Sequence, residues 1–177
     1  MATIRFIYGL ICFISFFGHW QFDSHLLTKK AASDKIITIA QSQIGVTETS
    51  RKGQEAIKQY LNYVNIKTDA AWCAAFVSWV YKEAGYQEPR TAWSPALFPK
   101  LKQTLNPQKG DILGIYFVKL ERIAHCGLVE QTYHDWVVSI EGNTNVSGSR
   151  NGDGVYRKWR HKRGISKYAR WLPKNVN

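Results

Sequence analysis

The chain has 177 residues, of which 45% are hydrophobic and 21% charged, so a disordered or collagen-like chain is excluded. This length is enough for one domain whose hydrophobic core needs neither disulfides nor a metal. The formal charge is +11, with nine basic residues and one acidic residue in residues 150–177, which predicts a polyanionic partner.

The first element in chain order is an apolar N-terminal segment. A single basic residue, Arg5, precedes an apolar run over residues 6–17. Such a run is short for a membrane span and typical of the core of a secretory signal. Residues 1–24 are therefore predicted to be a signal peptide or a retained membrane anchor. The protein is expected to be exported to the periplasm, the cell envelope or the medium, with its folded domain over residues 33–173.

Four helices are predicted next. Apolar residues at helical spacing indicate a helix over residues 33–45, with Ser33 or Asp34 as its N-cap, and an amphipathic helix over residues 53–64. Residues 69–85 read as a helix that is apolar on nearly every side and ends at Gly85. The pair Ser94-Pro95 predicts an N-cap and the first residue of a short fourth helix.

Short runs rich in β-branched and aromatic residues follow the helices and predict strands. They cover residues 110–118, 122–131, 135–142, 153–160 and 167–172. Helices followed by strands favour an α+β fold with an antiparallel sheet. The polar, glycine-rich segment 142–154 is expected to be a loop or the rim of a binding site.

Cys73 lies in the first turn of the apolar helix, where two interpretations are open. Free cysteine is among the most frequently buried residues, so Cys73 can simply fill the core. A helix N-terminus also lowers the pKa of a thiol, which would make Cys73 a nucleophile. In an exported protein, a disulfide between Cys73 and Cys126 is a third interpretation.

A thiolate nucleophile needs a histidine, and a polar group that orients the histidine. His125 is flanked by small residues inside a predicted strand, whereas the other four histidines lie in segments that read as exposed: His19, His25, His134 and His161. Glu141 and Asn143 end the next strand and, two residues apart, are expected on one face near His125. One of them would accept a hydrogen bond from Nδ1–H of His125 and leave Nε2 facing the thiol.

Taken together, these residues resemble a CHAP domain, a family of cysteine, histidine-dependent amidohydrolases/peptidases related to papain-like cell-wall hydrolases such as the NlpC type. The resemblance covers roughly residues 36–172 and rests on an ordered set of motifs: "WCAAFVSWV", "GDI", "HCGLV" and "EGNTN". It implies a papain-like arrangement, in which the nucleophile begins a buried helix packed on the antiparallel sheet.

The resemblance also implies a function. Such domains cleave amide bonds in peptidoglycan, either between N-acetylmuramic acid and L-alanine or within the stem and bridge peptides. By position, Cys73 becomes the nucleophile, His125 the base and then the acid, Glu141 the orienting residue and Asn143 a supporting polar residue. The backbone N–H of Cys73 is expected to face the oxyanion, and Trp72 and Trp93 are candidate substrate-binding residues.

Cys126 departs from the family pattern, because an apolar residue such as valine is expected directly after the histidine. Strand alternation predicts that Cys126 faces away from His125, into the core and away from Cys73.

A catalytically silent module that binds cell wall or a polyanion is the alternative function, and a zinc enzyme lacks the usual ligand spacing. No cofactor, metal or nucleic-acid partner is expected. Peptidoglycan is the predicted partner, together with anionic envelope polymers bound by the basic C-terminal segment, and the protein is expected to be a monomer.

Overall fold

The computed structural model describes residues 26–146 and 152–172. The predicted signal or anchor over residues 1–24, with His19, and His25 lie outside these ranges, as does part of the predicted 142–154 loop. The described residues form an α+β fold with three α-helices and a five-stranded antiparallel sheet, which confirms the predicted fold class.

The helices form one side of the molecule. Residues 26–42 are helical, so this helix starts before Ser33 and the predicted N-cap is wrong. Instead, the Ser33 hydroxyl donates to the carbonyl of Lys30 within the helix. Helix α2 (Arg51–Tyr63) begins after Ser50, whose hydroxyl accepts a hydrogen bond from the N–H of Gly53 and so satisfies one free donor of the first turn.

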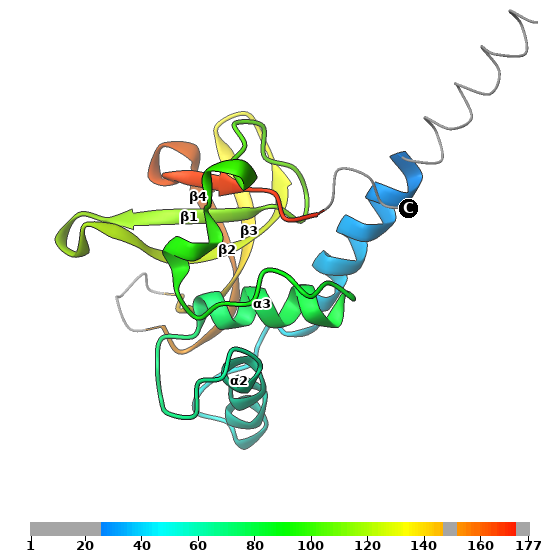
Figure 1. Cartoon of the computed structure of the whole chain (residues 1–177). Coiled ribbons are helices and arrows are strands. Elements are labelled where there is room, and N and C mark those ends of the chain that lie inside the picture. Colours follow the sequence, from blue (N-terminus) through cyan, green and yellow to red (C-terminus); the bar gives the residue numbers. More distant parts are fainter. Residues whose placement is uncertain (1–25, 147–151, 173–177) are drawn as a thin grey trace, which may run out of the picture.

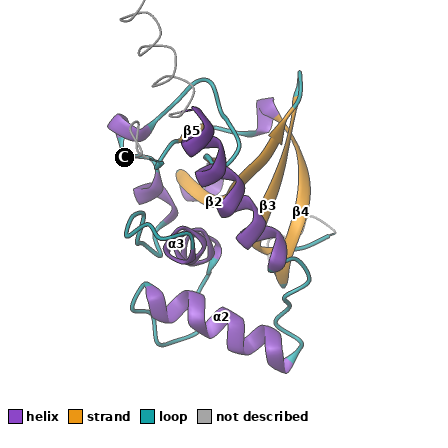
Figure 2. Cartoon of the chain, turned by 90° about the vertical axis from the view of Figure 1, so that its right-hand side faces the viewer, coloured by secondary structure: helices purple, strands orange, loops and turns teal. Residues whose placement is uncertain are grey.

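Helix α3 (Cys73–Glu83) is the central helix. It contacts β2 and β3 on one side and α2 on the other, as the two views show (Figures 1 and 2). Eight of its residues are buried, which explains why its sequence lacks a polar face. It ends before Gly85, whose φ of 101° lies in the left-handed region that glycine adopts readily.

The sheet has the strand order β4-β3-β2-β1-β5. The strands are β1 (Ile112–Phe117), β2 (Arg122–Thr132), β3 (Trp136–Thr144), β4 (Gly154–His161) and β5 (Lys167–Ala169), so each of the five predicted runs overlaps one strand. The main core lies between the sheet and α3 and includes Leu128 and Ile140, which are paired across β2 and β3. The opposite face has a smaller cluster: Leu113, Val129, Val137 and Ile165.

The predicted fourth helix is a short 3-10 helix, Ser94–Leu97. Its preceding residue is Trp93, and no side chain caps it, so the prediction that Ser94 caps this helix is wrong. The Ser94 hydroxyl is directed to the start of α3 instead, where it contacts the sulfur of Cys73.

Candidate active site

Cys73 is the first residue of α3, and only 3% of its surface is exposed. Its sulfur lies 3.4 Å from the hydroxyl oxygen of Ser94. The first N–H groups of a helix have no partner within the helix and carry a partial positive charge. The sulfur and the backbone N–H of Cys73 therefore lie where negative charge is stabilised.

His125 and Glu141 form a buried pair across β2 and β3. Nε2 of His125 donates to Oε2 of Glu141 over 2.8 Å, and His125 is 8% exposed. The predicted partner is found, but the ring is reversed: we expected Nδ1 to face the carboxylate. Since Nε2 is occupied, Nδ1 is the ring nitrogen that remains for the thiol of Cys73.

Glu141 has no exposed surface, yet its oxygens have hydrogen-bond donors from three side chains. Besides His125, the hydroxyl of Ser139 donates to Oε1 over 2.6 Å and Nε of Arg160 donates to the same oxygen over 2.8 Å. Burial alone would raise the pKa of Glu141, but the bonds from Arg160 and His125 outweigh it and lower the pKa to about 2. Glu141 is therefore a carboxylate at neutral pH.

The thiol and the imidazole shift each other's pKa in opposite directions. Hydrogen bonding from Cys126, followed by interactions with His125 and Ser94, holds the pKa of Cys73 well below its ordinary value although burial acts against it. Burial would lower the pKa of His125, but its bonds to Cys73 and Glu141 raise it to about 9. At neutral pH the pair is accordingly a thiolate and an imidazolium, the reactive form of a cysteine nucleophile.

Cys126 does not face away from Cys73 as we expected. It is fully buried in the main core, to which Cys73 also belongs, and interacts with Cys73 strongly enough to shift the pKa of both thiols, while both cysteines are free. Strand alternation does turn its side chain into the core against α3, but Cys73 belongs to the same core cluster. Burial raises the pKa of Cys126 well above its ordinary value, so Cys126 stays a neutral thiol beside Cys73.

Asn143 has a role different from that of Glu141. The β3–β4 register shifts between Glu141 and Thr144, and Asn143 has a φ of 53°, so the expected alternation does not hold there. Its amide accepts a hydrogen bond from the N–H of Trp72 over 3.1 Å and donates to the carbonyl of Gly152 over 3.3 Å. Asn143 thus fixes the residue before Cys73, and it is Glu141 that binds His125.

The two predicted substrate-binding tryptophans lie in different environments. Trp72 is 2% exposed, and its indole N–H donates to Glu48 over 2.9 Å. Trp93 is 54% exposed, and the guanidinium carbon of Arg122 lies 4.3 Å from the centre of its ring. Only Trp93 therefore offers a large surface to a ligand.

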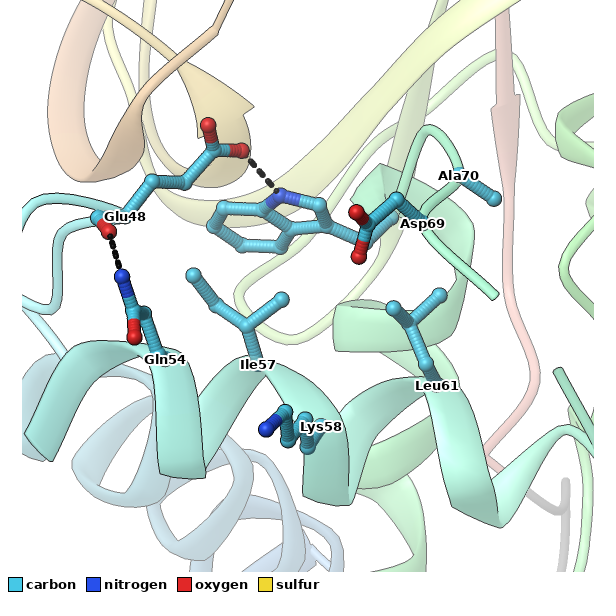
Figure 3. Close-up of a pocket in the computed structure, with 8 residues that line it drawn as sticks. Glu48, Gln54, Ile57, Lys58, Leu61, Asp69 and Ala70 are labelled. Atoms are coloured by element: carbon cyan, nitrogen blue, oxygen red, sulfur yellow. Dashed lines mark hydrogen bonds between the residues drawn. The ribbon is translucent and has the colours of Figure 1, made fainter. Parts of the chain in front are cut away.

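A cavity of about 470 Å³ lies beside Trp72, the residue that precedes Cys73. Ile57 and Leu61 of α2 form an apolar side, and Glu48 and Asp69 contribute carboxylates (Figure 3). Trp72 borders this cavity, whereas Cys73 does not line it.

Ser94, Arg160 and Cys126 also belong to the site, although their sequence context does not predict this. Ser94 fits a helix cap by residue type, and Arg160 lies within the basic C-terminal segment. A signal for Arg160 exists: a buried carboxylate at the end of a strand needs a cation, and the following strand contains several. The sequence does not show which of them lies opposite Glu141.

No protein-family model matches the chain, and no curated protein has a significantly similar sequence. The resemblance to CHAP domains therefore stays a prediction. Within residues 26–146 and 152–172, no helix is long and apolar enough to cross a membrane. The same residues contain no group of three or more His, Cys, Asp or Glu side chains suited to a metal ion.

Proposed function

We propose that the protein is a cysteine amidohydrolase or peptidase of peptidoglycan with a papain-like arrangement of its site. The observation that supports this most directly is the buried His125–Glu141 pair, joined at 2.8 Å, together with the electrostatic interaction of His125 with the thiol of Cys73 at the start of α3. A thiol at a helix start, a histidine that contacts it and a buried carboxylate that orients the histidine are the groups that nucleophilic amide hydrolysis requires.

In the proposed reaction, the Cys73 thiolate attacks the carbonyl carbon of the substrate amide. A C–S bond forms, and negative charge develops on the carbonyl oxygen, where the backbone N–H of Cys73 can donate to it. The C–N bond then breaks as the His125 imidazolium gives its proton to the leaving amine. Water next attacks the thioester, His125 takes a proton from it, and a carboxylic acid and the thiolate are released.

The site environment supports this chemistry. Cys73 and His125 keep little exposed surface, so their charges interact in a medium with few water molecules. The hydrogen bond that Glu141 accepts from His125 fixes the ring in one orientation. Bonds from Arg160 and Ser139 hold the carboxylate of Glu141 in place. The proposal includes export, because a cell-wall substrate lies outside the cytoplasm. It also includes peptidoglycan as the partner and a monomeric protein.

The test is release of soluble fragments from purified sacculi, with mass spectrometry of the products to identify the cleaved amide. We expect release by the wild type and by chelator-treated protein, and none by Cys73→Ala. A folded protein that binds sacculi but releases nothing would favour the alternative, a catalytically silent wall-binding module. Release that continues in Cys73→Ala would contradict the proposed nucleophile.

A further inference from the structure

Two observations link Arg122 to the candidate active site, its place in β2 and its contact with Trp93. It begins β2, three residues before His125. Its guanidinium stacks on Trp93, the residue next to Ser94, and the Ser94 hydroxyl contacts the Cys73 sulfur at 3.4 Å. The sheet and the 3-10 helix therefore each bring one half of the Arg122–Trp93 pair to the neighbourhood of the thiol.

Arg122 differs from three arginines that follow it in the chain because it has no acidic partner among the described residues. Arg157, Arg160 and Arg170 bind the carboxylates of Glu130, Glu141 and Asp111 respectively. None of the ion pairs formed by the described residues includes Arg122, and its one hydrogen bond goes from Nη1 to the carbonyl of Ile123 over 3.2 Å. A cation three residues before His125 in β2 is thus left without a counter-charge among the described residues.

Only one hydrogen bond within the described residues uses the five N–H donors of this guanidinium, which leaves donors for an anion. A ring contact uses the face of the guanidinium, whereas its N–H donors lie in the plane and point to the edge. A carboxylate accepts two parallel N–H bonds from such an edge. Trp93, with 54% of its surface exposed, would pack on the apolar part of the same ligand.

From these observations we infer that Arg122 and Trp93 form a recognition site for a carboxylate group carried by the substrate close to the amide that Cys73 attacks. The inference rests on the proposed function and narrows it. The preferred substrate is a peptide with a free carboxylate near the scissile bond, and amidation of that carboxylate weakens its binding. Arg122 acts in binding and specificity, and Cys73 and His125 carry out the chemistry.

The first experiment needs no hydrolysis. The rate at which Cys73 is alkylated by iodoacetate, which carries a carboxylate, is divided by the rate with neutral iodoacetamide, and mass spectrometry identifies the labelled cysteine. Arg122→Gln is expected to lower this ratio roughly 3- to 10-fold, as removal of one nearby charge would.

The matched control is Arg90→Gln. The guanidinium of Arg90 also lies over an aromatic ring, that of Tyr63 at 5.0 Å, but Arg90 lies beside Gly85 at the other end of α3. A ratio that is unchanged in Arg122→Gln, or that falls equally in Arg90→Gln, would overturn the carboxylate site.

The second experiment uses muropeptides whose stem carboxylates are free and the same muropeptides after amidation. The wild type is expected to show a KM about 10-fold or more lower for the free form, with a similar kcat, in line with a charge-assisted bond pair. Arg122→Gln should lose this preference, Arg122→Lys should retain part of it, and melting temperatures should match the wild type. Equal KM values for both substrates in the wild type would reject the carboxylate site but would still support the proposed hydrolase function. Charge-selective labelling without cleavage of any muropeptide would reject the hydrolase and leave the anion site intact.

Discussion

The carboxylate of Glu141 makes polar contacts with three side chains although none of its surface is exposed. A buried charge without partners costs several kcal/mol, and the bonds from Arg160 and His125 keep this carboxylate ionised. Arg160 supplies the compensating charge and Ser139 a neutral donor, which leaves the bond to His125 free to orient the ring. The same contacts of Glu141 therefore stabilise a buried charge and orient the ring of His125.

Substitution of Glu141 by Gln tests its orienting role. The amide keeps the shape of the side chain but loses the charge, so the pKa of His125 falls and the imidazolium is less favoured. We expect turnover on sacculi to fall roughly 10- to 100-fold, less than the loss of about 10³-fold or more expected for His125→Ala or Cys73→Ser. Asn143→Ala is the comparison, because Asn143 holds Trp72 and not the histidine. If Asn143→Ala abolished turnover while Glu141→Gln retained the full rate, Asn143 would be the orienting residue.

The acidity of Cys73 gives a second test at the residue scale. Because its pKa lies well below the ordinary value, alkylation by iodoacetamide should stay fast as the pH falls below 7. His125→Ala and Cys126→Val each remove a group that lowers this pKa, while burial, which raises it, remains. Both variants should therefore need a higher pH for half-maximal labelling.

The control for this measurement is the denatured protein, in which Cys73 should behave as an ordinary thiol with a pKa near 8.5. The same profile in the native wild type would contradict the thiolate–imidazolium pair. At the alkaline end, the imidazolium should be lost as the pH passes about 9, the pKa of His125. Mass spectrometry of non-reduced active protein should find both cysteines free, and a Cys73–Cys126 disulfide in active material would exclude Cys73 as nucleophile.

At the scale of elements, β3 and α3 approach closely at Gly142. A Cβ atom there would lie 2.7 Å from ring carbons of Phe76 and Trp72, two side chains fixed in the core. Gly142→Ala should therefore push the strand from the helix and lower the free energy of unfolding by about 1–3 kcal/mol. It should also reduce turnover, because the displaced strand carries Glu141.

Gly164 provides the control for this substitution. A Cβ atom at Gly164 meets nothing within 4 Å, so Gly164→Ala should leave the unfolding midpoint and turnover close to those of the wild type. Equal midpoints for Gly142→Ala and Gly164→Ala in denaturant unfolding would show that β3 and α3 are not closely packed there.

The elements themselves could be predicted because their signals are local. Alternating and β-branched runs located the five strands, and apolar spacing located α2 and α3. The start of the first helix could not be placed, because Ser33 fits an N-cap by residue type while the helix continues before it. Capping preference is a weak local signal that neighbouring helical residues override.

The details of the site depend on contacts between segments far apart in the sequence. The pairing of Arg160 with Glu141 requires the β3–β4 register, which an irregularity after Glu141 shifts. The ring orientation of His125 and the contact of Cys126 with Cys73 depend on where α3 begins relative to β2. The sequence thus predicts that a histidine, a thiol and a carboxylate lie together, but it does not predict which atoms of each form the contacts.

At the scale of the whole molecule, the charge of +11 is less available than the sequence suggests. Arg157, Arg160 and Arg170 belong to the basic C-terminal segment, yet each is paired with a buried or half-buried carboxylate. Arg163 and Lys167 in the same segment are exposed, and no ion pair of the described residues includes them. These two cations are therefore better placed than the paired arginines to attract an anionic envelope polymer.

Binding of the Cys73→Ala variant to purified sacculi separates this attraction from catalysis. The bound fraction should fall as salt rises, because exposed charges are screened over about 8 Å at physiological ionic strength. Changing both Arg163 and Lys167 to Gln should weaken binding at low salt more than the same change at Lys52 and Lys67, two exposed lysines outside the C-terminal segment. Both double variants carry the same net charge, so a difference between them depends on location alone. Equal weakening would mean that total charge governs binding, and binding that is indifferent to salt would exclude an electrostatic contribution altogether.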